Sequence, residues 1–162
     1  MNKKSSEALN PSVNLLFIFL TVAALLFGGF VYILWRPSEP VFFNLMDTLG
    51  LEGWLNHVRI HSVSVSRFLP EWFVYSLPNG LWAFAFALCI ATTWRNSKSR
   101  IKYFWMGAIT LLVPGFEILQ YFQVIPGTFC FQDLLFGSIG LITGIFIGIK
   151  SIKNYSHEKN II

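Results

Sequence analysis

The sequence predicts an all-α integral membrane protein: a four-helix transmembrane bundle that forms one polytopic domain over residues 1–162. Composition is the first observation behind this prediction. Only 12% of the 162 residues are charged and 54% are hydrophobic, whereas a soluble domain carries about 25% charged residues. The second observation is that the apolar residues form runs of roughly 18 or more, which is the length that a helix needs to cross the hydrocarbon layer.

Four stretches are long enough to be transmembrane helices. They cover residues 14–35, 72–94, 103–122 and 131–149. The first of them could also be the apolar core of a signal peptide. It is longer than the usual core of about 7–15 residues, and no small-residue cleavage site follows it before Trp35, so an uncleaved first span is predicted.

The distribution of lysine and arginine predicts the orientation of these spans. Nine of the 12 lysines and arginines lie before residue 14, between residues 95 and 102, or after residue 149. The other three are Arg36, Arg59 and Arg67. Because cytoplasmic loops retain positive charge, we expect a protein of the cytoplasmic (inner) membrane with both termini in the cytoplasm. The net charge of +4 then reflects topology and the anionic inner leaflet, and no nucleic-acid partner is expected.

The outer segment of residues 36–71 connects the first two spans. Apolar residues recur at near-helical spacing within 41–60, which predicts a helix lying in the membrane interface. Residues 57–68 are rich in β-branched side chains and are expected to be extended. His57 and His61 would share one face in either conformation, but the sequence places no third ligand beside them. Solvated polar histidines are therefore preferred, and neither a metal nor a cofactor is expected.

Polar side chains inside the last three spans mark a candidate site. Asn79 follows Pro78 and is either an interhelical hydrogen-bonding group or a donor to a ligand. Glu117 and Gln120 are three residues apart and share one helix face. A carboxylate inside a span predicts a functional site, so Glu117 is the central candidate.

A short loop containing Pro126 and Gly127 makes the third and fourth spans adjacent and antiparallel. Asp133 falls in the first turn of the fourth span, where the helix dipole favours a carboxylate. It is either a helix cap or a member of the site of Glu117. We predict one outward-facing polar pocket, lined by Glu117 and Asp133 together with Gln120 and Asn79, with Arg67 as the candidate cation.

Glycines recur along the fourth span: Gly137, Gly140, Gly144 and Gly148. Small residues at this spacing let two helices approach closely. The face they form is predicted to pack against another span of the chain, with homodimerisation as the alternative. Leu141 and Ile145 are expected to face lipid.

This constellation resembles the VanZ-like membrane proteins. The resemblance rests on Glu117 and Gln120 in an E-x-x-Q pattern, a short Pro-Gly loop, and Asp133 opening a span with Gly140 and Gly144. The stretch LPNGLW, residues 77–82, also resembles a polar-interrupted span of some relatives, so that the similarity covers residues 75–148. The chain lacks an arginine between the two acidic positions and an asparagine before the glycines that many members carry.

The resemblance implies a small multi-pass protein of the bacterial cell envelope, from a family whose namesake is associated with resistance to teicoplanin-type glycopeptide antibiotics. We expect a non-enzymatic protein that binds or modulates an envelope lipid or a lipid-linked cell-wall precursor. One alternative is an intramembrane enzyme acting on a lipid-linked substrate, with Glu117 and Asp133 as an acid/base pair. Another is a structural subunit whose glycine face docks onto other membrane proteins.

Overall fold

The computed structural model describes residues 11–36, 44, 46–94, 97 and 99–158, which are largely helical. The helices are α1 (Pro11–Trp35), α3 (Glu52–Ser66), α4 (Glu71–Thr93), α5 (Ile101–Tyr121) and α6 (Phe131–Glu158). Of these, α1, α4, α5 and α6 are long and apolar enough to cross a membrane. The prediction of an all-α membrane bundle is confirmed, and the four spans lie where the apolar runs placed them.

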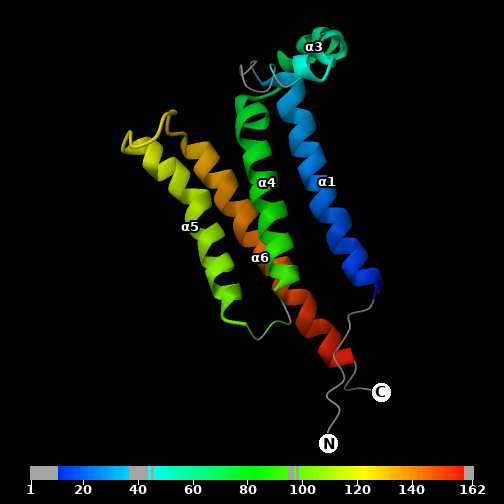
Figure 1. Ribbon diagram of the computed structural model, residues 1–162, viewed down its shortest axis with the longest axis vertical. Coiled ribbons are helices and arrows are strands. Elements are labelled where there is room, and N and C mark those ends of the chain that lie inside the picture. Colours follow the sequence, from blue (N-terminus) through cyan, green and yellow to red (C-terminus); the bar gives the residue numbers. More distant parts are fainter. Residues whose placement is uncertain (1–10, 37–43, 45, 95–96, 98, 159–162) are drawn as a thin grey trace, which may run out of the picture.

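The four long helices run alternately up and down (Figure 1). The start of α1 and the end of α6 lie at one end of the bundle, while α3 and the 122–130 loop lie at the other. We call the latter the α3 end. The long helix α6 continues past the predicted span boundary at residue 149 and ends at Glu158.

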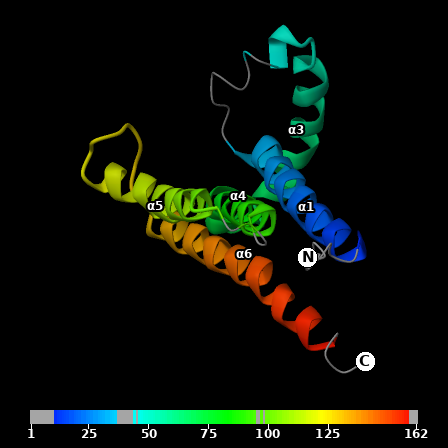
Figure 2. The same cartoon turned by 60° about the horizontal axis from the view of Figure 1, so that its bottom comes forward.

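Helix α4 is the centre of the bundle. It lies between α1 and α6, and α5 packs beside α6 and α4 (Figure 2). Small side chains on α4 allow the backbones of neighbouring helices to approach it closely on two sides. The fully or nearly buried alanines of α4 are Ala83, Ala85, Ala87 and Ala91. Pro78 is inside α4, which continues through it.

The glycine face of α6 packs against α4 within the same chain. A Cβ atom at Gly144 would lie 2.6 Å from the carbonyl oxygen of Phe84, and one at Gly140 would overlap the carbonyl oxygen of Gly80. The next glycine, Gly148, is equally close to α4. The α6 backbone therefore meets the α4 backbone at Gly140 and Gly144 and the Ala91 side chain at Gly148, and this close approach requires glycine.

The side of α6 next to the glycine face is covered by α5. Gly137 faces Val113 of α5. Leu141 is 5% exposed and packs in the core with Ile109, and Ile145 is packed against the same cluster. The expectation that Leu141 and Ile145 face lipid is therefore wrong, because α5 occupies that side of the helix.

The helix predicted for residues 41–60 is interrupted at Gly50. Gly50 has φ of 68°, and its N–H donates to Asp47 while that of Leu51 donates to Met46. This pattern ends a helical turn in a Schellman motif. Residues 37–43 and 45 lie outside the described residues. A new helix, α3, starts at Glu52.

The prediction that residues 57–68 are extended is wrong, since α3 is helical to Ser66. One face of α3 is docked on the end of α1. Leu55, one turn before Arg59 on the same face, is buried, with 2% of its surface exposed. The Arg59 guanidinium donates to the carbonyl oxygens of Ile33, at 3.0 Å, and Arg36, at 2.7 Å. Cations near the last carbonyl groups of a helix are favourable, so this docking outweighs the strand propensity of the β-branched residues.

Candidate functional site

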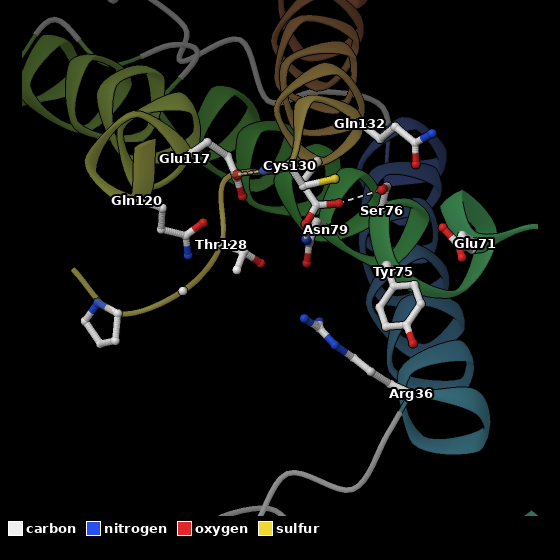
Figure 3. Close-up of a pocket in the computed structure, with 13 residues that line it drawn as sticks. Arg36, Glu71, Tyr75, Ser76, Asn79, Glu117, Gln120, Thr128, Cys130 and Gln132 are labelled. Carbon is white, nitrogen blue, oxygen red and sulfur yellow. Dashed lines mark hydrogen bonds between the residues drawn. The ribbon is translucent and has the colours of Figure 1, made fainter. Parts of the chain in front are cut away.

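A cavity of about 680 Å³ lies at the α3 end of the bundle (Figure 3). Its volume is within the range of roughly 300–1,000 Å³ that is usual for ligand pockets. The described residues that line it are Arg36, Glu71, Tyr75, Ser76, Asn79, Glu117, Gln120, Pro126, Gly127, Thr128, Cys130, Gln132 and Asp133. The structure thus brings together four of the five predicted ligand-binding residues: Asn79, Glu117, Gln120 and Asp133.

Asp133 joins the first turn of α6 to α4. Its Oδ1 accepts a hydrogen bond of 2.5 Å from the Ser76 hydroxyl, and its Oδ2 accepts one of 3.1 Å from the Asn79 amide. Ser76 is fully buried. A buried hydroxyl without a partner is unfavourable, so the pairing stabilises the contact between the two helices. Asn79 is an interhelical donor and also lines the cavity.

Ser76 was missed by the sequence analysis. The signal was present, because Ser76 precedes Asn79 by three residues and therefore shares its helix face. A serine among apolar residues is common in transmembrane helices, however, and can bond to its own backbone. The role of Ser76 is evident only from the folded structure, in which its hydroxyl lies next to the Asp133 carboxylate.

Glu117 connects α5 to the start of α6. Its Oε2 accepts a hydrogen bond of 3.1 Å from the backbone N–H of Cys130, the residue immediately before α6. A carboxylate at a helix N-terminus is favoured by the helix dipole and by the unpaired N–H groups. Glu117 of α5 thus caps the start of α6, which is the role considered for Asp133. The Asp133 carboxylate instead accepts hydrogen bonds from side chains of α4.

The loop between α5 and α6 forms one wall of the cavity. Gln123, with φ of 57°, ends α5 in a Schellman motif, in which the N–H of Val124 donates to Leu119. The chain then folds back so that Gly127 lies against the side chain of Gln120. A Cβ at Gly127 would lie 2.5 Å from Gln120 Nε2, and its φ of 134° also favours glycine.

Arg36, directly after α1, is the cation of this cavity among the residues that the structure describes. Its guanidinium lies 5.0 Å from the ring centre of Tyr32 and 6.0 Å from that of Tyr75. Figure 3 shows the side chain reaching into the cavity. The predicted cation, Arg67, is instead the residue that follows α3; its side chain is exposed and does not line the cavity.

From the sequence, Arg36 was only one of the three cations outside the predicted cytoplasmic segments, and an arginine at the end of a span normally extends its charge toward water. The inward direction of its side chain depends on the two tyrosine rings. Tyr32 is one turn earlier on α1, but Tyr75 comes from α4. That contact is visible only once the two helices are packed.

The histidine pair lies away from the cavity, on exposed positions of α3. The rings of His57 and His61 have centroids 4.7 Å apart, and His61 Nδ1 is 2.8 Å from the carbonyl oxygen of His57. In the described part of the chain, no group of three or more His, Cys, Asp and Glu side chains is placed to hold a metal ion.

Comparisons with known proteins found no family model, no curated protein and no solved structure that matches this chain. The cavity itself is therefore the basis for a functional proposal.

Proposed function

We propose that this chain is a VanZ-like multi-pass protein of the cell envelope that binds an envelope lipid or a lipid-linked cell-wall precursor in the cavity at its α3 end. The observation that carries the proposal is the convergence of polar side chains from α4, α5 and α6, with Arg36 beside α1, on one cavity. The cavity lies where the helices end, which is the level of lipid head groups.

The face of α4 below the cavity is suited to an attached hydrocarbon chain. Tyr75, Asn79 and Phe86 are four and seven residues apart, and this spacing puts them on one side of the helix. Phe86 is 56% exposed. An amphiphile could therefore place its head group in the cavity and its apolar chain along this face.

The proposal also specifies the membrane that contains the protein and the direction in which the helices cross it. We place the α3 end outside the cytoplasmic membrane and both termini in the cytoplasm, because nine of the 12 lysines and arginines then lie inside. The cavity opens at the outer surface in this orientation, where lipid-linked cell-wall precursors are used.

Binding is better supported than the two alternatives. Both oxygens of Asp133 already accept hydrogen bonds from α4, which favours a fixed structural position over proton transfer. The glycine face of α6 is occupied by α4, which removes the surface invoked for docking a larger complex.

Lipid analysis tests the proposal. The protein is purified in a mild detergent, and its retained lipids are identified by mass spectrometry. We expect one lipid class to be enriched over its share of the membrane, and Thr128→Trp, which narrows the cavity, to lose that enrichment. The control is Phe129→Trp, because Phe129 is next to Thr128 in the sequence but does not line the cavity. Identical lipid profiles for the wild type and Thr128→Trp would contradict binding in this cavity.

The link to antibiotic resistance has a separate test. Expression in a teicoplanin-susceptible bacterium should raise the inhibitory concentration of teicoplanin, and Thr128→Trp should reduce that effect. Unchanged susceptibility with normal membrane expression would separate this chain from the role of the family's namesake.

A further inference from the structure

The orientation of Arg36 indicates what the cavity binds. An arginine at the end of a transmembrane helix ordinarily extends toward the aqueous side. Here the guanidinium is held over the ring of Tyr32, one turn back along α1, and near that of Tyr75. Among the described residues, no carboxylate forms an ion pair with it. Within the described part of the chain, the cavity therefore contains a positive group without a carboxylate partner, and this group can attract an anion.

The remaining charges of the cavity are negative. Glu71, Glu117 and Asp133 line it together with Arg36. Asp133 is engaged at both oxygens by α4, whereas Glu117 uses Oε2 for the Cys130 amide, and no described residue donates a hydrogen bond to its Oε1. A ligand with only negative charge would be attracted by one guanidinium and repelled by three carboxyl groups. A ligand with only positive charge would leave Arg36 without a partner.

We propose that the cavity binds a zwitterionic head group in which a phosphate ester is joined to a primary amine. The inference rests on the proposed function and names the ligand class of the same site. The phosphate lies against Arg36, since a guanidinium binds phosphate oxygens in a bidentate manner. The ammonium group lies against Glu117 on the opposite wall.

A primary amine fits this wall better than a quaternary one. Its three N–H groups can donate to acceptors, which here are Glu117 and the side-chain oxygens of Gln120 and Thr128. A trimethylammonium group has the same charge and donates no hydrogen bond. The pocket is therefore expected to distinguish phosphatidylethanolamine from phosphatidylcholine, and both from anionic phosphatidylglycerol.

The experiment uses the full-length protein, delipidated in detergent and titrated by calorimetry with three short-chain probes: dihexanoyl phosphatidylethanolamine, phosphatidylcholine and phosphatidylglycerol. We expect the ethanolamine lipid to bind about tenfold more tightly than the other two. Arg36→Gln should weaken its binding by about tenfold. Glu117→Gln, whose amide oxygen can still accept from Cys130, should remove its advantage over the choline lipid.

Two matched controls lie outside the cavity lining. Arg67→Gln removes an exposed arginine, and Asp47→Asn removes an exposed carboxylate. Both should keep the wild-type affinities. If Arg67→Gln and Arg36→Gln weaken binding equally, the assignment of the phosphate to Arg36 is overturned.

The outcomes separate this inference from the proposed function. If no probe binds the wild-type protein, the zwitterionic assignment is rejected, and the proposed function is then decided by the lipids that the purified protein retains. If the three lipids bind equally, or if Glu117→Gln keeps the ethanolamine preference, the zwitterionic assignment is rejected while lipid binding stands. Soluble phosphoethanolamine is the fourth probe. If it binds as tightly as the lipid, the head-group chemistry is supported and a lipid is rejected as its source.

Discussion

The side-chain amide of Asn79 donates to Oδ2 of Asp133 at 3.1 Å and so joins the third turn of α4 to the first turn of α6. Ser76 donates to the other oxygen of the same carboxylate. One aspartate therefore satisfies two polar groups of a neighbouring helix, one of them fully buried. The contact that shapes the cavity is also a contact that stabilises the bundle.

Asp133→Ala should destabilise the protein by about 2–4 kcal/mol, because the Ser76 hydroxyl and the Asn79 amide both lose their acceptor. Gln132→Ala, at the neighbouring exposed position, should change stability by less than about 0.5 kcal/mol. Reversible unfolding in mixed detergent measures both variants. Equal stability of the two would show that the aspartate is not the link between α4 and α6.

Gly144→Ala should destabilise the bundle by about 1–3 kcal/mol, since even a methyl group would meet the Phe84 carbonyl oxygen and push α6 away from α4. Gly115→Ala is the matched control, because a Cβ there has no atom within 4 Å. That variant should be as stable as the wild type or slightly more stable. The same unfolding assay applies, and similar losses for both glycines would argue against a close α4–α6 crossing.

Arg59→Gln should loosen α3, because the guanidinium that bonds to the carbonyl oxygens at the end of α1 is removed. Hydrogen bonds to charged groups contribute about 1.5–3 kcal/mol, so backbone hydrogen exchange in α3 should accelerate by about tenfold or more. Arg67→Gln, at the far end of the same helix, should leave exchange unchanged. Wild-type protection in Arg59→Gln would mean that Leu55 and its neighbours hold α3 alone.

Gln123→Gly should stabilise the protein by about 0.5–1 kcal/mol, because Gln123 has a left-handed backbone conformation that glycine adopts without strain. Gly127→Ala should act in the opposite direction, since its φ of 134° is unfavourable for alanine and the methyl group would meet Gln120. Thermal unfolding in detergent gives both shifts. A lower melting temperature for Gln123→Gly would indicate that its side chain contributes more than its backbone strain removes.

Single cysteines test the orientation. In a background with Cys89 and Cys130 replaced by alanine, Ser64→Cys on α3 and Ser99→Cys before α5 lie at opposite ends of the bundle. An impermeant thiol reagent should label position 64 in intact cells and position 99 only after lysis. The reverse pattern would invert the proposed topology.

The sequence by itself determined that this is a membrane protein and where its four spans lie, because only a long apolar run can cross the hydrocarbon layer as a helix. It also predicted the close helix crossing, since glycines at four-residue spacing leave a flat surface on α6. The short Pro-Gly loop required α5 and α6 to be neighbours. The juxtaposition of Glu117 and Asp133 at one cavity follows from that constraint.

The tertiary structure decided which side chains meet. When a helix is apolar on most sides, its sequence does not show which side faces a neighbouring helix and which faces lipid. The sequence therefore did not show that α4 is central or that α5 covers Leu141. It also did not show that Ser76 faces Asp133. Likewise, α3 is helical because Arg59 and Leu55 dock on α1, against the local preference of its β-branched residues. Arg36 rather than Arg67 is the cation of the cavity for the same reason: its direction is set by a tyrosine on another helix, and such contacts exist only after the helices have packed.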